Sequence, residues 1–594
     1  MGTTAALKTW ELGTDGGVSV GQPGKAGAPS RGQLGLGRSG VGDLGNGDGS
    51  SQSQLRPAAP TSYLTSVVTI NNGGILRKAR RGVPPRDHDP LIWLFCVSLA
   101  VIIVLRRWRV QGNPRLPPGP KPLPIIGNMM IADQFTHRGL AALAKRYGGL
   151  LHLRVGSLRI FVVSTPELAR EALHTQDGDF SHRPATAAVR YLTYGRSDLA
   201  FARSGSAYWR QMRRLCATRL FSRRRAETWL AVRDGYRALA RAVGESGGDG
   251  QAVNLGELIF GHTVRVIFRA AFSAVYHDGD EGLGEFISMF PEFSKLLEAF
   301  HIGDFFPWLG WVGRRGFDRR LRTARDALGE FLDRIIDEHV RRGKDADDAD
   351  ADMVDGLLSF VAHANQAGEG GLSFTRDNVK AVMMDMLFGG PDTVGATIEW
   401  AMAEMIRSPG ILRRLQRELA GVVGLDRTVD ESDLARLPFL KCVVKETFRM
   451  HPPIPMHLHG TTKDCILGGY SVPRGSRVLI NAWALGHDDE ARKDADVFRP
   501  SRFMPGEGEA AGLDLKGGCY EFLPFGAGRR SCPAQGLGPY AVEFAVATLA
   551  HGFDWELPDG MDPAELDMAD IFGVTVSRAT RLCVVPKPRL TCSL

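Results

Sequence analysis

The sequence predicts a mainly α-helical protein with small β-sheets, preceded by a single N-terminal membrane anchor helix. Three observations support this prediction. Helical periodicity dominates from Ile125 to the C-terminus, strand-like runs are short and clustered, and the uncharged stretch LIWLFCVSLAVIIVL fills residues 91–105. The 594 residues are 43% hydrophobic and 23% charged, an ordinary globular composition that excludes collagen, a disulfide knot and wholesale disorder.

Residues 1–85 are rich in Gly and Ser and offer no repeating apolar face to bury. We therefore expect a disordered Gly/Ser-rich extension. A transit peptide is the weaker interpretation, because four acidic residues lie within the first 48 positions and targeting segments are poor in acid.

Residues 86–109 are predicted to form the membrane anchor. The 15-residue apolar run is about 23 Å long as a helix, against a hydrocarbon core of about 30 Å, so a buried core helix or a signal-peptide core stays open as an alternative. Arg106, Arg107 and Arg109 follow the run and favour the anchor, because arginines at a helix end reach the interface. Their position predicts that the rest of the chain lies in the cytosol.

Residues 110–124 are predicted to be a stiff proline-rich hinge, and residues 125–594 one catalytic domain. The charged stretch 343–352 is expected to be a solvated loop. The clearest helical patterns cover residues 138–147, 204–220, 321–342, 375–406, 410–423 and 440–450. Strand-like runs cover residues 150–155, 159–164, 477–480 and 580–585.

Charge and cysteine usage decide little alone. A formal net charge of +7 suits a membrane surface, a nucleic acid or an acidic protein partner equally well. The eight cysteines form no CxxC pair or close cluster, which excludes a zinc ribbon and a disulfide framework and indicates a reducing compartment. Any functional cysteine must therefore act singly.

One cysteine stands in an informative context, the segment FLPFGAGRRSCPAQGLG at residues 522–538. Phe525, Gly528, Arg530 and Cys532 have the spacing F-x-x-G-x-R-x-C, which resembles the haem-binding signature of the cytochrome P450 family. A lone buried cysteine is more often a small hydrophobic residue, but chance is a poor explanation for four matched positions. The resemblance implies the cytochrome P450 fold and haem b, with Cys532 as the axial thiolate ligand of the iron and Arg530 paired with a propionate. Pro533 favours a helix that starts directly after the ligand.

Further motifs of that family occur in the proper order. Glu446 and Arg449 form an E-x-x-R pair, and the resemblance implies that Arg502 in FRPSRF completes a buried network with them. Trp209 and Arg213 in WRQMR resemble the residues that contact the haem propionates. Taken alone, the first motif reads as an exposed salt bridge and the last as an amphipathic basic helix.

Residues 375–406 are predicted to form one long helix with FGGPDTVG in its middle, similar to the family motif [AG]-G-x-[DE]-T. The resemblance implies that Thr393 and Asp392 are catalytic and deliver protons during oxygen activation. Taken alone, the motif is explained equally well by glycines that allow close helix packing, next to an Asp-Thr pair that caps a helix. Two residues depart from the family pattern: Pro391 removes a helical hydrogen bond and crowds the carbonyl of Leu387, and Ala534 replaces a glycine after the ligand.

Longer strings resemble the plant ferulate 5-hydroxylase family, also called coniferaldehyde 5-hydroxylases. They lie at residues 122–141, 181–202, 292–311, 451–459 and 565–582. The resemblance implies hydroxylation at ring position C5 of coniferaldehyde, coniferyl alcohol or ferulate in phenylpropanoid and syringyl lignin biosynthesis. It implies electrons from NADPH through a cytochrome P450 reductase and single-pass attachment to the endoplasmic reticulum membrane, and it implies no nucleic acid partner.

By the same analogy, residues 185–199 and 454–458 should line an apolar pocket for the phenolic substrate. Arg210, Arg214 and Arg529 are candidates for reductase docking, although a generic basic surface explains them equally well. Two alternative functions stay open. One is a cytochrome P450 that acts on another substrate, such as a flavonoid, and the other is a haem-binding paralogue whose turnover is impaired by Pro391 and Ala534.

Overall fold

The computed structural model describes residues 93–95, 97–102, 115–221, 226–272, 281–343, 351–367 and 373–593. The predicted extension at residues 1–85 lies outside this part of the chain, as do most of the predicted anchor and the first third of the predicted hinge. Residues 93–95 and 97–102 are helical, and their large apolar side chains are exposed, for example Phe95 at 68%. Among the described residues, no helix combines the length and the apolarity that crossing a bilayer requires.

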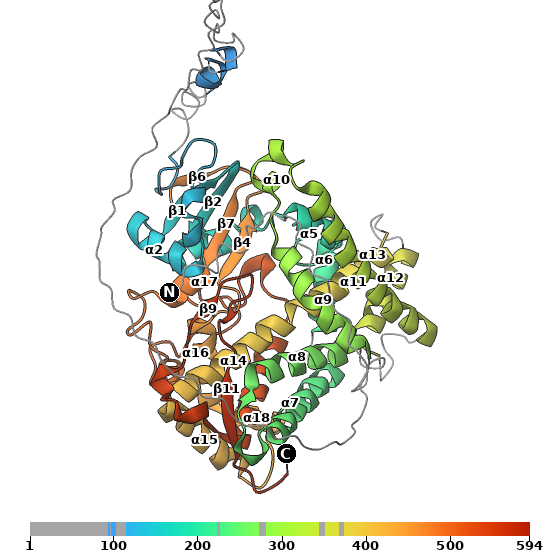
Figure 1. The fold of residues 1–594 in the computed structure, drawn as a ribbon, viewed down its shortest axis with the longest axis vertical. Coiled ribbons are helices and arrows are strands. Elements are labelled where there is room, and N and C mark those ends of the chain that lie inside the picture. Colours follow the sequence, from blue (N-terminus) through green and yellow to red (C-terminus); the bar gives the residue numbers. More distant parts are fainter. Residues whose placement is uncertain are drawn as a thin grey trace, which may run out of the picture. The chain divides into compact units, whose positions relative to one another are not determined.

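Helices dominate residues 115–593, as the sequence predicts, and the largest core lies where they cross (Figure 1). α18 (Leu537–Gly552) is the central helix. Fourteen of its sixteen residues are buried, which is typical of a helix that is apolar all round. It packs against α7 (Ala226–Ser246), α14 (Pro391–Arg407), α15 (Pro409–Val423) and α16 (Pro438–Met450).

The remaining helices surround this core and the sheet. They are α2 (His137–Tyr147), α3 (Pro166–Arg170), α4 (Asp177–Phe180), α5 (Ala187–Leu192), α6 (Ala207–Leu215), α8 (Leu255–Phe272), α9 (Glu281–Glu298), α10 (Ile302–Phe305), α11 (Arg314–Arg342), α12 (Met353–Ala367), α13 (Arg376–Gly389) and α17 (Ala482–Gly486). The last turn of the helix that begins with α6 is a π-helical segment, Cys216–Leu220.

The main sheet has four strands in the order β1-β2-β7-β4. They are β1 (Leu150–Val155), β2 (Leu158–Val163), β7 (Arg477–Asn481) and β4 (Met456–Gly460). The β2–β7 pair is parallel and the two outer pairs are antiparallel. In Figure 1 this sheet and α2 lie at the opposite end of the domain from α7, α15 and α18.

Three smaller sheets complete the fold. They are β3-β11-β8 (Val253–Asn254, Cys583–Pro588, Phe553–Glu556), β5-β6 (Cys465–Leu467, Tyr470–Val472) and β10-β9 (Ser577–Arg578, Asp570–Ile571). Residues 115–124, the last two thirds of the predicted hinge, are tied to the sheets. The amide of His152 donates to the carbonyl of Pro118, and the amide of Ser471 donates to that of Arg115.

Three sequence predictions are corrected here. The predicted helix at residues 375–406 is two helices, because Pro391 has no amide hydrogen and takes the first position of α14, where an amide needs no partner. The helix after Cys532 begins at Leu537 rather than at Pro533, which precedes a turn. The strand predicted at residues 580–585 is shifted, since β11 begins at Cys583.

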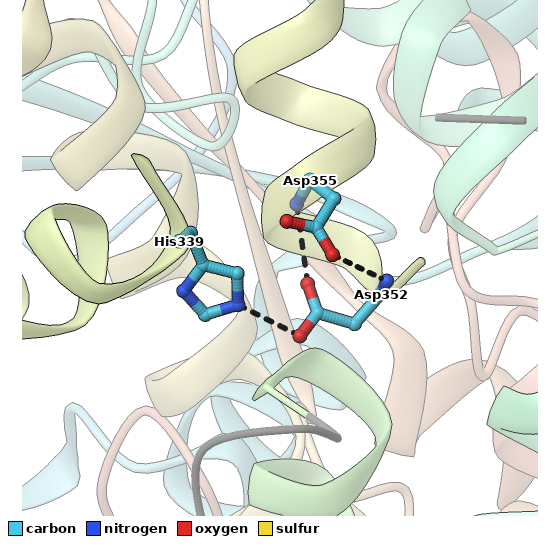
Figure 2. Close-up of side chains that lie close together, drawn as sticks. All are labelled: His339, Asp352 and Asp355. Carbon is cyan, nitrogen blue, oxygen red and sulfur yellow. Dashed lines mark hydrogen bonds and ion pairs between the residues drawn. The ribbon is translucent and has the colours of Figure 1, made fainter. Parts of the chain in front are cut away.

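A buried polar group joins the end of α11 to the start of α12 (Figure 2). His339 Nδ1 bonds the carbonyl oxygen of Ile335 at 2.7 Å, so Nδ1 carries a proton, and Nε2 lies 2.8 Å from Asp352 Oδ2. The other Asp352 oxygen accepts the amides of Val354 and Asp355. The expectation of a solvated loop at residues 343–352 is therefore wrong at its last residue, because Asp352 caps a helix and is only 2% exposed.

The oxygen and nitrogen atoms of His339, Asp352 and Asp355 lie within 4.8 Å of one another, as metal ligands would. The hydrogen bonds favour another interpretation. An imidazole that donates from Nδ1 and faces a carboxylate with Nε2 is a protonated imidazolium, which has no lone pair for a metal ion. We interpret the group as an ion pair that joins two helices.

The His339–Asp352 pair predicts a pH-dependent stability. Burial lowers the pKa of His339, but the hydrogen bond and charge of Asp352 outweigh burial, so the pKa is raised above its usual 6.5. Stabilisation is then complete below pH 6.5 and is lost as the pH rises through the raised value. We expect His339→Gln to lower the free energy of unfolding by about 3 kcal/mol at pH 6, since it breaks a buried pair, and by less at pH 9.

Thermal unfolding of the holoenzyme at both pH values measures this effect. His363→Gln is the matched control, because His363 is exposed on α12 and should give the same small change at each pH. An equal loss for His339→Gln at pH 6 and pH 9 would contradict the ion-pair interpretation.

Candidate active site

Residues 525–532, here called the cysteine loop, form a tight turn that is held by a backbone hydrogen bond and by one aromatic contact. The amide of Cys532 donates to the carbonyl oxygen of Phe525 at 2.8 Å. The ring of Phe525 packs edge-on against Phe448 of α16, with 5.2 Å between centroids. Gly528 has φ +66°, and a Cβ there would lie 2.5 Å from the carbonyl oxygen of Leu173, so only glycine fits.

The Cys532 thiol lies deep in the domain, and the residue is still partly accessible to solvent. Burial raises its pKa, although its side chain is partly accessible. The amide of Ala534 and the positive charges of Arg213 and Arg183 act in the opposite direction and favour the thiolate. A coordinated metal ion would deprotonate the sulfur outright, and these donors would then stabilise the resulting anion.

Trp209, Arg213 and Arg530 all reach the cysteine loop or the segment beside it. Arg213 Nη2 donates to Ser531 Oγ at 3.0 Å. Arg530 donates to the carbonyl oxygens of Ser181, Leu199 and Ala202, and its guanidinium carbon lies 4.5 Å above the Trp209 ring. The Trp209 indole N–H donates to the Leu199 carbonyl oxygen at 3.2 Å. These contacts fasten the loop to residues 181–202, and the propionate contacts of Trp209 and Arg530 stay predictions.

One buried donor near the loop, Nε of Arg183, has no acceptor among the described residues. His457 lies on β4 beside Gly526; burial lowers its pKa to about 4, so the imidazole is neutral, and because it already donates to the backbone of Ile454, its Nδ1 is an acceptor. The Arg183 charge acts on both Cys532 and His457, so the three groups are neighbours. A buried donor without an acceptor is rare in native proteins, and a carboxylate group would satisfy it. The residues present therefore fit an iron porphyrin, which presents an iron to the sulfur and a propionate to this donor.

From the sequence alone, Arg183 had no predicted role and His457 lay only in a predicted pocket-lining segment. Arg183 is one of three arginines in residues 181–202, and its burial near Cys532 depends on a contact across some 350 positions of the chain. Sequence spacing carries no information on such a contact.

Glu446, Arg449 and Arg502 meet in a buried network. Arg449 binds the carboxylate of Glu446 with two parallel contacts of 2.8 Å, and Arg502 Nε donates to Glu446 Oε1 at 3.0 Å. All three side chains are fully excluded from solvent. Arg502 Nη1 also pairs with the carboxylate of Glu509 at 2.5 Å. The other donors of Arg449 and Arg502 bind backbone carbonyls between α17 and the cysteine loop, at Gly486, Lys493, Asp494, Ala495 and Val497.

Thr393 and Asp392 lie at the break between α13 and α14. Thr393 Oγ donates to the carbonyl oxygens of Gly389 at 2.8 Å and Gly390 at 3.2 Å. A Cβ on Gly389 would meet no atom within 4 Å, so the helix faces open space at this point. Burial, reinforced by the charge of Glu298, raises the pKa of Asp392 to about 6. Asp392 can thus gain and lose a proton near neutral pH.

The predicted docking and lining residues are distributed as follows. Arg210, Arg214 and Arg529 are exposed, and Arg529 pairs with Asp177 at 3.0 Å. Of residues 454–458, Met456 and Leu458 are partly accessible, whereas His457 is buried. Within residues 185–199, α5 buries Ala188, Val189 and Leu192 in the core, so part of this segment packs rather than lines a pocket.

Fold and site together define a haem-thiolate protein: a mainly helical domain with one cysteine on a turn, cationic donors around it and a broken helix that opens onto space. The family model "Cytochrome P450" matches residues 117–583. The chain belongs to the cytochrome P450 family and is a plant cytochrome P450 monooxygenase. Membership implies a haem ligated by a thiolate.

Individual relatives agree with this assignment. The chain is 50% identical to cytochrome P450 84A1 of Arabidopsis thaliana over 512 residues, covering 84% of this chain and 96% of that protein. It is 40% identical over 492 residues to a flavonoid 3'-monooxygenase of Arabidopsis thaliana, covering 82% and 94%. A zebrafish cytochrome P450 structure with abiraterone aligns with a TM-score of 0.63 at 28% identity, covering 76% of this chain and 99% of that one.

The ligand assignment predicts the outcome of one substitution. Cys532→Ser should abolish the red-shifted Soret band of the reduced carbon monoxide complex and all turnover, because an alcohol does not supply a thiolate. Cys519→Ser is a suitable control, since Cys519 lies 13 positions earlier on the approach to the loop. A thiolate-type spectrum that persists in the Cys532→Ser protein would remove Cys532 as the ligand.

Proposed function

We propose that the protein hydroxylates the aromatic ring of coniferaldehyde, coniferyl alcohol or ferulate at C5, in phenylpropanoid and syringyl lignin biosynthesis. The observation that carries the proposal is the resemblance of five long strings, spread from residue 122 to residue 582, to the ferulate 5-hydroxylase family. The 50% identity to cytochrome P450 84A1 over 512 residues supports it, because similarity of that extent includes the segments around the open space.

The chain's own residues have distinct roles in this reaction. A bound haem supplies an iron centre that activates dioxygen. Cys532 ligates that group from the cysteine loop, with Phe525 and Gly528 shaping the turn. Arg183, Arg213 and Arg530 provide positive charge around it.

Proton supply belongs to the broken helix. Asp392, with a pKa of about 6, would take a proton from solvent and pass it to the hydroxyl of Thr393. That hydroxyl is held on the carbonyl oxygen of Gly389 and, when haem is bound, would donate a proton to the reacting oxygen. Glu446, Arg449 and Arg502 act structurally and keep the cysteine loop in place.

Electrons come from NADPH through a cytochrome P450 reductase that docks beside the cysteine loop, where Arg210, Arg214 and Arg529 offer positive charge to an acidic partner. Residues 86–109 anchor the protein in the endoplasmic reticulum membrane, and the hinge holds the catalytic domain, residues 125–594, on the cytosolic side. Residues 1–85 form the extension that precedes the anchor.

Two specific observations favour second candidates. Flavonoid 3'-monooxygenases of three plants are 38–40% identical to this chain, which favours a flavonoid as the alternative substrate. Pro391 and Ala534 favour a haem-binding paralogue with impaired turnover.

Expression with a plant reductase in microsomes, followed by product analysis, tests these candidates. We expect the 5-hydroxylated product from coniferaldehyde and none from naringenin. Product from naringenin alone would transfer the assignment to flavonoids. A normal reduced carbon monoxide spectrum with NADPH consumption and no product from either compound would indicate impaired turnover.

The proton-delivery role predicts that Thr393→Ala uncouples electron use from product. Product per NADPH should fall severalfold while haem content is unchanged, because only the hydroxyl is lost. Thr397→Ala is the matched control, one turn further along α14, where the hydroxyl likewise bonds a helix carbonyl but is buried. Unchanged coupling in Thr393→Ala would remove Thr393 from the mechanism.

A further inference from the structure

Three segments far apart in the sequence meet near Gly389. They are the C-terminal end of α9, the α13–α14 junction and the turn between β9 and β10. Ring stacking joins α9 to the α13–α14 junction, because the ring centroid of Phe388 lies 5.0 Å from that of Phe290 and 4.5 Å from that of Phe293. The turn joins them through one hydrogen bond, from the amide of Val574 to Oε1 of Glu298 at 3.0 Å.

Glu298 is an unusual group at this position. It is the last residue of α9 and is exposed, although burial raises the pKa of its carboxyl. Its side chain is therefore close to other protein groups and still accessible to a ligand. Among the described residues, no lysine or arginine forms an ion pair with Glu298. The cation that acts on neighbouring Asp392, Arg581, pairs with Glu399 at 2.7 Å instead.

The β9–β10 turn, which binds Glu298 through Val574, carries accessible apolar side chains. Ile571 is 52% exposed, Phe572 40% and Val574 56%, although all three lie on or beside a two-stranded sheet within the domain. Apolar side chains that remain accessible around a single fixed acceptor are the composition of a ligand pocket. The backbone bond from Val574 fixes the carboxylate, so it is preorganised for a ligand.

A second carboxylate, that of Asp392, lies near Glu298. The charge of Glu298 acts on Asp392 and helps to raise its pKa, which puts the two groups within electrostatic reach of each other. A ligand that carries a carboxylate into this space would meet two like charges in surroundings of low polarity. A ligand with a neutral hydroxyl would meet an acceptor.

We propose that Glu298 is a specificity-determining residue, whose carboxylate accepts a hydrogen bond from a hydroxyl group of an aromatic ligand and excludes ligands that carry a carboxylate at that end. The selection by charge depends only on the geometry around Gly389 and on family membership. The identity of the natural ligand as a phenylpropanoid rests on the proposed function.

Two aromatic azoles of equal shape test the charge selection without turnover. 4-(Imidazol-1-yl)benzyl alcohol and 4-(imidazol-1-yl)benzoic acid both bind haem iron through the imidazole nitrogen and shift the Soret band, which gives a Kd for each in microsomes that contain the full-length protein. At pH 8 we expect the alcohol to bind at least about tenfold more tightly than the acid, because like charges in a partly buried site repel strongly. Equal affinities in the unmodified protein would overturn the proposal by themselves.

Substitutions test whether Glu298 causes this difference in affinity between the alcohol and the acid. Glu298→Gln removes the charge and should reduce the alcohol-to-acid ratio about tenfold, whereas Glu298→Asp keeps the charge and should retain most of the ratio. Glu292→Gln is the matched control on the same helix, since Glu292 is exposed and pairs with Arg320 on the outer surface. An unchanged ratio in Glu298→Gln would overturn the proposal, and an intact reduced carbon monoxide spectrum would verify that the variant is folded.

The same titration with coniferyl alcohol and ferulate separates this inference from the proposed function. Suppose that Glu298→Gln reduces the ratio of affinities for the imidazolyl alcohol and the imidazolyl acid, while neither coniferyl alcohol nor ferulate produces a spectral shift. The substrate assignment is then wrong and the role of Glu298 stands. If coniferaldehyde is hydroxylated while the azole ratio ignores Glu298, the role of Glu298 falls and the proposed function stands.

Discussion

The carboxylate of Glu446 is fully buried and holds two guanidinium groups at once, and the position of the cysteine loop depends on it. Without it Arg449 would lose its counter-ion in the interior, which costs about 3–5 kcal/mol, and Arg502 would keep only Glu509. Phe448, the neighbour of Arg449 on α16, contacts Phe525 at the base of the loop. An electrostatic cluster far from any solvent thus fixes the turn on which the sulfur stands.

The two departures from the family pattern fall where the backbone tolerates them. Pro391 occupies the first position of α14. Because the helix is already broken at Gly390, no helical hydrogen bond is lost at the amide that proline lacks. Ala534 contributes its amide to the Cys532 sulfur, and a backbone amide is present whatever the side chain. Neither residue removes a group that the proposed chemistry uses, which favours an active enzyme over an impaired paralogue.

Basic and acidic groups gather around different residues of the site. Around Cys532 the protein gathers arginines, and Arg183 Nε among them has no acceptor in the described part of the chain. Asp392 has the carboxylate of Glu298 as a neighbour. Positive surroundings favour a thiolate and bind carboxylates, whereas neighbouring carboxylates hold protons more tightly and repel anionic ligands.

By itself, the sequence determined the fold class, most helices and the residues of the cysteine loop, because periodicity, turn glycines and motif spacing are local signals. It also placed Glu446, Arg449 and Arg502 in one network by resemblance. Only the tertiary structure decided that Arg183 and His457 lie near Cys532, that Asp352 caps a helix against His339, and that Glu298 lies within electrostatic reach of Asp392. These pairings join residues from 13 to several hundred positions apart, and a contact made by folding leaves no trace in the spacing of either partner.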